Sequence, residues 1–383
     1  MRRKSSVIVL LIALAGLVPW PTDRSIAAAC GAAPDASDEF QTASPEQAKL
    51  DPTILCSLDE KLNARKEANV HAVVVLRGGR LVFETYRSGD DWMWGTKLGA
   101  VGYTPAKLHD TQSVSKSIVS LLIGVAIDHK LIASVDESVF SYFPEYGAIR
   151  TPEKDEIKLR DLLTMTAGLA ANDTYVDWYS PANTEREMYQ SADPYKTVLE
   201  RKLWNKPGEW WNYNSGCTML LAAVLHRVTG KRLIDFAKEA LFDPLGIKDF
   251  EWITVEPSGE PAAGGGLRLR PRDMAKIGQL ILNKGEWSGH PVVSASWIEE
   301  SAQPRYPTWW SRKYGYQWWV GSSEIGEKSY PWIASLGLGG QRIFIVPELS
   351  LVVAITAGMY DSDRQDGVVM DVFEDFVLAS VRD

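Results

Sequence analysis

The sequence predicts an α+β fold: an antiparallel sheet flanked by helices, with an all-helical lobe inserted into it. Two observations carry this prediction. Apolar runs of strand length lie near residues 71–86 and 316–356, whereas between residues 119 and 249 the apolar residues recur with helical spacing. The simplest arrangement is one sheet built from both terminal regions of the chain. A cleft between the two lobes is then the place to expect a functional site.

The elements are expected in chain order. Residues 51–66 have helical periodicity, residues 71–76 and 81–86 form a β-hairpin, and a loop rich in glycine and aromatic residues runs up to residue 110. Helices follow over residues 113–129, 159–165, 194–203, 215–228 and 233–241, separated by Pro and Gly. The last part has helices over 272–282 and 294–301, strands over 316–320, 341–346 and 351–356, and a closing helix over 366–380. This assigns residues 51–118 and 250–383 to the sheet lobe and residues 119–249 to the helical lobe.

The first 29 residues have the features of a signal peptide. Residues 2–4 are basic, residues 7–18 form a short apolar run, and the alanines at 27–29 suit a cleavage site. The apolar run is too short to span a bilayer, so we expect export to the periplasm or the medium, without stable membrane insertion after cleavage. An uncleaved anchor, lipidation of Cys30 and twin-arginine export remain alternatives. Residues 30–50, rich in Ala, Ser, Asp and Pro, are expected to form a flexible leader.

Charge and cysteine content exclude some function classes. A net charge of −8 over 383 residues argues against nucleic-acid binding, which needs a basic surface. Cys30 and Cys56 could pair in an oxidising compartment, although spacing alone cannot decide this, and Cys217 lies in an apolar helix as a buried thiol. The five histidines are scattered and match no metal-ligand spacing. The spacing of the cysteines and histidines therefore suggests neither a metal site nor a cofactor.

Ser113-Val114-Ser115-Lys116 is an S-x-x-K tetrad at the start of a long apolar helix. Such a tetrad also occurs by chance on helix surfaces, so its context decides its meaning. Residues three apart share one helix face, and the N–H groups at a helix start favour a developing anion. The apolar segment draws Lys116 into a buried setting, where the neutral amine is favoured and can take the proton of Ser113.

Two further segments carry candidate site residues. Tyr213 stands between the Pro-Gly turn at 207–208 and another apolar helix, although an isolated tyrosine there could simply complete the core. Residues 336–341, Leu-Gly-Leu-Gly-Gly-Gln, precede a strand, and glycines either form a turn or let backbone approach a ligand. A backbone N–H near Gln341 could complete an oxyanion hole with the N–H of Ser113.

In this order and at these separations, the three segments resemble the serine β-lactamase and DD-peptidase superfamily, in its class C-like branch. Residues 162–169, L-L-T-M-T-A-G-L, are similar to its L-L-T-x-T-S-G-L stretch, and residues 270–275 resemble a helix opening of that family. The resemblance covers roughly residues 60–380. It implies a β-lactamase/transpeptidase-like fold, an ester or amide substrate of small size, and no cofactor. It also implies the catalytic residues Ser113, Lys116 and Tyr213.

Within that superfamily, the chain most resembles hydrolases of the 6-aminohexanoate-dimer type and their esterase-like relatives. It has Tyr-x-Ser at residues 213–215 where β-lactamases have Tyr-x-Asn, a loop at 172–177 similar to one that supplies a second tyrosine, and a Gln-Trp-Trp strand at 317–319. By this resemblance, Tyr175 would bind the substrate amide, and Tyr213 would share proton transfer with Lys116. The other expected substrate-binding residues are Ser215, Gly339, Gly340 and Gln341.

The chain departs from β-lactamases at the third motif. Those enzymes carry Lys-Thr-Gly or His-x-Gly, which helps to hold a penicillin carboxylate, whereas residues 338–340 are Leu-Gly-Gly. We therefore expect hydrolysis of an ester or amide through a Ser113 acyl-enzyme rather than strong β-lactamase activity. The alternatives are a DD-peptidase or weak β-lactamase, a Ser-His-Asp hydrolase, for which no G-x-S-x-G elbow is present, and a non-catalytic binding module on the same fold.

Tryptophans gather in the last third of the chain. They could line an apolar cleft suited to acyl substrates, or pack between sheet and helices. The residues concerned are Trp309, Trp310, Trp318, Trp319 and Trp332.

Overall fold

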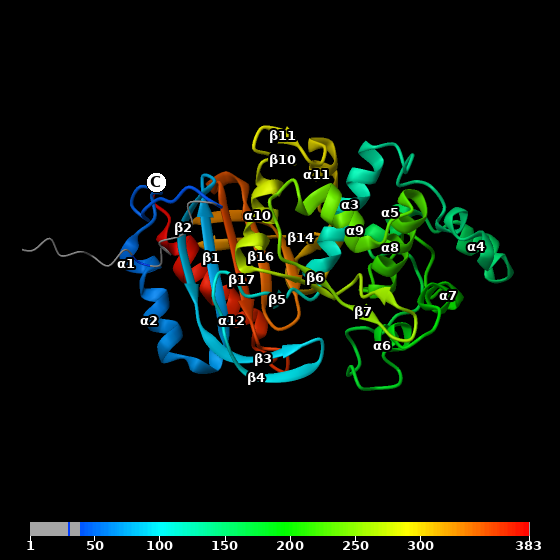
Figure 1. The fold of residues 1–383 in the computed structure, drawn as a ribbon, viewed down its shortest axis with the longest axis horizontal. Coiled ribbons are helices and arrows are strands. Elements are labelled where there is room, and N and C mark those ends of the chain that lie inside the picture. Colours follow the sequence, from blue (N-terminus) through cyan, green and yellow to red (C-terminus); the bar gives the residue numbers. More distant parts are fainter. Residues whose placement is uncertain (1–29, 31–38, 383) are drawn as a thin grey trace, which may run out of the picture.

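The computed structural model describes residue 30 and residues 39–382. At its centre lies an eight-stranded antiparallel sheet in the order β12-β13-β14-β15-β16-β17-β1-β2 (Figure 1). The strands are β1 Val70–Arg77, β2 Arg80–Tyr86, β12 Tyr306–Pro307, β13 Lys313–Tyr314, β14 Trp319–Ile325, β15 Lys328–Gly337, β16 Gln341–Val346 and β17 Leu351–Ala357. Because β1 pairs with β17, the two terminal regions form one sheet. The predicted α+β fold is confirmed.

Helices fill the chain between the two groups of strands, on the side drawn in green in Figure 1. They are α3 Val114–Asp128, η2 Val139–Tyr142, η3 Pro144–Ile149, α4 Pro152–Asp155, α5 Leu159–Leu163, α6 Thr184–Tyr189, α7 Pro194–Glu200, α8 Ser215–Thr229, α9 Leu233–Ala237 and η4 Lys238–Phe242. Helices α3 and α8 are buried over most of their length and pack against each other. No helix in the described part of the chain combines the length and hydrophobicity needed to cross a membrane.

The remaining elements lie before, between and after these two groups. The helical ones are α1 Pro52–Leu55, α2 Ser57–Ala64, η1 Lys66–Ala68, α10 Pro271–Leu282, α11 Ala295–Ser301, η5 Trp309–Ser311, η6 Pro347–Leu349, α12 Gln365–Asp371, η7 Val372–Val377 and η8 Leu378–Ser380. The short strands are β3 Ser88–Met93, β4 Thr96–Gly102, β5 His109–Asp110, β6 Glu251–Trp252, β7 Thr254–Val255, β8 Glu260–Pro261, β9 Leu267–Leu269, β10 Glu286–Trp287 and β11 His290–Pro291. Cys30 and Cys56 form a disulfide, whereas Cys217 is a buried free thiol.

Helical segments cover both faces of the sheet, as the alternation of side chains along β16 shows. A β-carbon added to Gly278 of α10 would contact Val352 and Ile343, so α10 covers the face that carries Ile343. The next residue of β16, Phe344, points to the opposite face and stacks on Phe373 of η7, with ring centroids 4.1 Å apart. The sheet is therefore buried between two helical layers.

Replacing Gly278 by alanine is expected to lower the free energy of unfolding by about 1–3 kcal/mol, because the sheet leaves no room for a methyl group. The added carbon would lie 2.4 Å from Cγ1 of Val352 and 2.9 Å from Cγ2 of Ile343. Urea denaturation measures the effect. Gly367 of α12, which has open space around it, is the matched control, and Gly367→Ala should be neutral or slightly stabilising. Equal stability of the two variants would show that α10 can move away without cost.

The structure differs from the expected elements in several places, since it also contains elements such as β15 and α6 that were not expected. Residues 39–50 are packed rather than forming a flexible leader, since Phe40, Ala43, Ala48 and Leu50 are buried and Ala43 bonds to Leu81. The expected loop before residue 110 contains the hairpin β3–β4, whose polar and largely exposed strands give no apolar alternation. The strand expected over 316–320 begins only at residue 319, because the backbone turns through a left-handed residue at 317. The expected signal peptide lies outside the described residues.

Candidate active site

Ser113 opens onto a cleft of about 880 Å³. Its walls come from the β3–β4 hairpin, the loop 173–179, helix α6, the region around η5 and the turn after β15. The residues lining it include Trp92, Trp94, Gln112, Ser113, Asp173, Tyr175, Asp177, Trp178, Glu185, Tyr189, Tyr213, Gly264, Trp309, Trp310, Leu338, Tyr360 and Asp361. The predicted cleft is therefore present, with aromatic rings and carboxylates as its main lining groups.

Ser113 and Lys116 are brought together by the start of α3. Gln112 has a φ of +51°, a conformation that a non-glycine residue rarely adopts, and the chain turns there so that Ser113 stands at the helix N-cap. One turn further on, Lys116 is only 1% exposed. Its Nζ donates hydrogen bonds to Oγ of Ser113, 3.0 Å away, and to the carbonyl oxygen of Gly264, 2.6 Å away. The amine is thus held in position for proton exchange with the hydroxyl.

Tyr213 joins this pair from the segment that leads into α8. It is 8% exposed, and Nζ of Lys116 lies 4.9 Å from the centroid of its ring. The ring also packs beside Trp309 and Trp319, with centroids 6.0 and 6.2 Å away. The three residues predicted to be catalytic therefore lie around one buried nitrogen, at the bottom of an open cleft.

An acidic residue that the sequence reasoning missed lies near Lys116. Glu185 of α6 lines the cleft, and its pKa is raised, chiefly by burial, although the charge of Lys116 acts to lower it. Beside it, the Tyr189 hydroxyl is buried without a hydrogen-bond partner in the described structure, and burial raises its pKa well above the usual value. Glu185 is therefore close enough to Lys116 for the charge of the lysine to act on its pKa.

Ser215 does not lie where a substrate-binding residue is expected. It is fully buried, does not line the cleft, and its backbone N–H donates to Oδ2 of Asp173, 2.5 Å away. Thr184 donates to the other oxygen of the same carboxylate, at 2.6 Å. Asp173 therefore ties the loop 173–179 to the start of α8. Ser215 contributes to the site through this backbone hydrogen bond.

The glycine-rich turn also differs from its expected role. Gln341 is buried, and its side-chain amide bonds to the backbone at Ala357, while Gly340 packs against Ala357 and Val369. Gly339 has a φ of +83° and would clash with Tyr360 if it carried a β-carbon. These residues shape the turn and do not line the cleft. That they contact substrate stays a prediction, to which the cleft lining adds no support.

Leu338 is the residue of this turn that faces Ser113. A β-carbon on the preceding Gly337 would lie 2.3 Å from the carbonyl oxygen of Thr111, so the end of β15 runs directly beside the segment that carries the serine. Leu338 lines the cleft together with Ser113. Within residues 39–382, the backbone N–H groups of both residues donate no hydrogen bond. Leu338, rather than the region of Gln341, is therefore the residue whose backbone N–H lies free beside Ser113 at the cleft in the described structure.

Aromatic residues divide between the cleft and the core. Tyr175 is 64% exposed at the cleft rim, where its ring meets that of Trp309 edge-on, with centroids 6.1 Å apart. Trp310 is exposed on the same rim, whereas the core contains Trp318, Trp319 and Trp332. Some of these tryptophans therefore line the cleft, and the others pack in the core.

Gly264 is a further site residue that sequence reasoning missed. A β-carbon there would lie 3.3 Å from Nζ of Lys116 and 3.2 Å from the Tyr189 hydroxyl, so the bare backbone lets the carbonyl reach the lysine. The run of three glycines at 264–266 was a signal for such a close approach. No sequence pattern pointed to Glu185 and Tyr189, because α6 is too short to show a clear helical periodicity.

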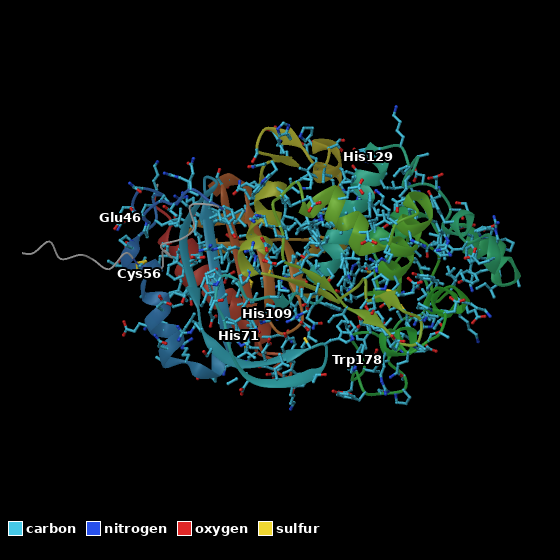
Figure 2. All side chains as sticks on the ribbon, viewed as in Figure 1. Glu46, Cys56, His71, His109, His129 and Trp178 are labelled. Carbon is cyan, nitrogen blue, oxygen red and sulfur yellow. A yellow bond between two sulfur atoms is a disulfide. The ribbon has the colours of Figure 1, made fainter. Side chains whose placement is uncertain are left out.

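One group of described side chains has the chemistry of a metal site, namely His71, Asp91 and His109. It lies outside the cleft lining, with His71 and His109 labelled in Figure 2. Sequence reasoning treated these histidines as scattered, because 38 residues separate them. The fold brings them together.

Comparisons with known proteins agree with the observed fold. The family model described as Beta-lactamase matches residues 58–368. The chain is similar to 6-aminohexanoate-dimer hydrolase of Paenarthrobacter ureafaciens, with 27% identity over 348 residues that make up 84% of this chain and 81% of that protein. It also resembles the structure of a candidate 6-aminohexanoate-dimer hydrolase from Bacillus anthracis, with a TM-score of 0.71, 22% identity, and coverage of 88% of this chain and 87% of the other. A class C β-lactamase variant has a TM-score of 0.61 and 16% identity, over 84% of this chain and 96% of its own.

Proposed function

Since the chain belongs to the Beta-lactamase family, we propose that it is an exported serine hydrolase that cleaves an ester or amide bond through an acyl-enzyme on Ser113. The observation that carries the proposal is the position of Lys116. Its nitrogen is buried, lies 3.0 Å from Oγ of Ser113 and faces the ring of Tyr213. Export rests on the signal-peptide pattern of residues 1–29.

The proposed reaction has two steps. Oγ of Ser113 attacks the substrate carbonyl carbon, while Lys116, together with Tyr213, takes the hydroxyl proton. The negative charge on the carbonyl oxygen is held by the N–H groups of Ser113 and Leu338. The C–O or C–N bond then breaks, and the leaving group receives the proton through Tyr213. A water molecule attacks the acyl-enzyme in the same way, which releases the acid and restores Ser113.

The lining of the cleft favours neutral or cationic acyl groups. Four acidic residues line it, Asp173, Asp177, Glu185 and Asp361, and no lysine or arginine is among the lining residues in the described part of the chain. The negative potential of these groups disfavours an acyl chain that carries a carboxylate. An amide with an aminoalkyl chain suits the same surroundings, and the P. ureafaciens relative is named for such a dimer. The hydrolase proposal is favoured over a DD-peptidase or β-lactamase by residues 338–340, which are Leu-Gly-Gly where those enzymes carry Lys-Thr-Gly or His-x-Gly.

The test is to mix the purified protein with p-nitrophenyl acetate, follow p-nitrophenol release, and map the acetyl group by peptide mass spectrometry. We expect a burst and an acetylated peptide that contains Ser113. A matched series of p-nitrophenyl esters with neutral, ammonium and carboxylate acyl chains then tests the charge argument, and the carboxylate ester should react at least about 10-fold more slowly. No burst and no adduct would favour the non-catalytic binding module, and an adduct on another residue would contradict the assignment of Ser113.

A further inference from the structure

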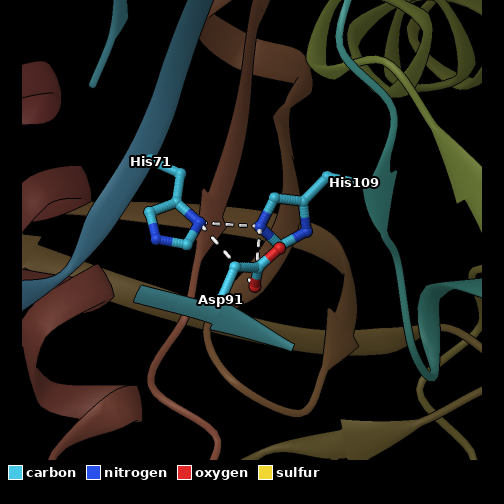
Figure 3. Close-up of side chains that lie close together, drawn as sticks. All are labelled: His71, Asp91 and His109. Atoms are coloured by element: carbon cyan, nitrogen blue, oxygen red, sulfur yellow. Dashed lines mark hydrogen bonds and ion pairs between the residues drawn. The ribbon is translucent and has the colours of Figure 1, made fainter. Parts of the chain in front are cut away.

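His71, Asp91 and His109 converge on one point from three different strands (Figure 3). They lie on β1, β3 and β5, and all three are buried. Nδ1 of His71 is 2.9 Å from Nε2 of His109, and Oδ1 of Asp91 lies 4.0 Å and 3.7 Å from these two nitrogens. Each residue therefore offers one atom of the kind that binds a transition metal.

The hydrogen bonds around the two rings fix where their protons are. Both Nδ2 hydrogens of Asn69 are used, at 2.8 Å to the carbonyl of Asp90 and 2.9 Å to that of Gly358, so its Oδ1 must face the His71 ring. Nε2 of His71 must then carry a hydrogen. Nδ1 of His109 lies 2.9 Å from the carbonyl oxygen of Asp110 and must carry one too.

In the neutral rings, the two remaining nitrogens then point lone pairs at each other across 2.9 Å. Such an arrangement needs a cation between the nitrogens, either a proton or a metal ion. A proton between the two nitrogens would leave Oδ1 of Asp91, 4.0 and 3.7 Å away from them, without a partner, whereas a metal ion would bind it as well. Oδ1 of Asp91 is buried and has no hydrogen-bond partner in the described structure, while its Oδ2 accepts from the Tyr103 hydroxyl.

We propose that His71, Asp91 and His109 bind a divalent transition metal ion, with zinc as the expected occupant. Ligands 2.0–2.1 Å from a tetrahedral zinc ion are separated by about 3.3 Å. The observed separations of 2.9, 3.7 and 4.0 Å lie on both sides of that value, so small side-chain shifts complete the geometry. Each histidine donates its other N–H to an oxygen, which is the arrangement that orients metal-bound imidazoles.

The surroundings hold these side chains tightly in place. A β-carbon on Gly89 would lie 2.2 Å from Oδ1 of Asn69, and one on Gly358 would lie 2.7 Å from Cε1 of His71. The His71 ring also stacks on Tyr103, with centroids 4.7 Å apart. Such packing leaves the rings few other orientations, so the ligand atoms are positioned before any ion binds.

The ion would act as a structural brace rather than in the hydrolytic reaction. None of its three ligands lines the cleft. Asp91, however, lies on the hairpin that brings Trp92 and Trp94 to the cleft, and His109 is four residues before Ser113. Binding would therefore fasten the hairpin and the segment before Ser113 to β1 of the central sheet.

The test measures metal content directly, in full-length processed protein without a polyhistidine tag. Elemental analysis after growth with zinc should find about one zinc ion per chain, and cobalt added to chelator-treated protein should give the visible absorption of a tetrahedral site. Asp91→Asn and His109→Gln should weaken binding by at least about 10-fold, as measured against a competing chelator. His129→Gln is the matched control, since this exposed histidine lies apart from His71 and His109 in Figure 2 and should leave binding unchanged.

The wild-type measurement decides the proposal even if a ligand variant fails to fold, which circular dichroism would reveal. Wild-type protein that takes up neither zinc nor cobalt would overturn it, and a shared proton seen on the imidazoles by NMR would then identify the occupant. Uptake that is equal in wild type, folded Asp91→Asn and His129→Gln would also overturn it, because the metal would then lie elsewhere.

Discussion

Replacing Ser113 by alanine is expected to remove the acyl-enzyme and to lower kcat/KM for p-nitrophenyl acetate by at least about 1,000-fold. The reason is that no other hydroxyl is held against Lys116 at the cleft in the described part of the chain, since Nζ bonds only to Ser113 and to the Gly264 carbonyl. Stability should change by less than about 0.5 kcal/mol, because the lysine keeps its backbone partner. Initial rates, single-turnover bursts and intact mass measure the three quantities.

Ser120→Ala is the matched control for this experiment. Ser120 lies on the same helix, α3, and its buried hydroxyl has no hydrogen-bond partner in the described structure, so its removal leaves no polar group unpaired. This variant should keep the burst and the adduct. If Ser113→Ala keeps both as well, another residue is the nucleophile and the central assignment is wrong.

Sequence reasoning found the residue pairs that local geometry brings together. Ser113 and Lys116 are one helical turn apart, so their proximity follows from the helix alone. Tyr213 was predicted because its segment precedes a second apolar helix, and in the structure that helix, α8, packs against α3. The apolar runs of β1, β2, β16 and β17 were predicted because buried strands need continuous apolar sequence.

The parts that sequence reasoning missed depend on contacts between distant segments. Whether Leu338 or Gln341 faces Ser113 is decided by where β15 ends beside residue 111, which the glycine pattern does not reveal. The convergence of His71 and His109 requires β1 and β5 to be placed by the sheet and by the β3–β4 hairpin, whose polar strands gave no signal. Glu185, on whose pKa the charge of Lys116 acts, lies on the short helix α6, which the sequence pattern did not predict.

Replacing Arg272 by methionine is expected to lower the free energy of unfolding by about 3–5 kcal/mol at pH 7, because it leaves a buried carboxylate unpaired. Nε and Nη2 of Arg272 donate to the two oxygens of Glu84, at 2.8 and 2.6 Å, and both side chains are buried. In the variant, only the Tyr86 hydroxyl still bonds to Glu84. Urea denaturation measures the loss, and Arg232→Met, which breaks an exposed pair with Asp235, should cost less than about 1 kcal/mol.

A second substitution separates the effect of the buried charge from that of lost packing. Adding Glu84→Gln, which keeps an acceptor for Tyr86 but removes the charge, should recover a large part of the loss at pH 7. A deficit that Glu84→Gln does not reduce would mean that the arginine side chain stabilises the fold mainly by its packing.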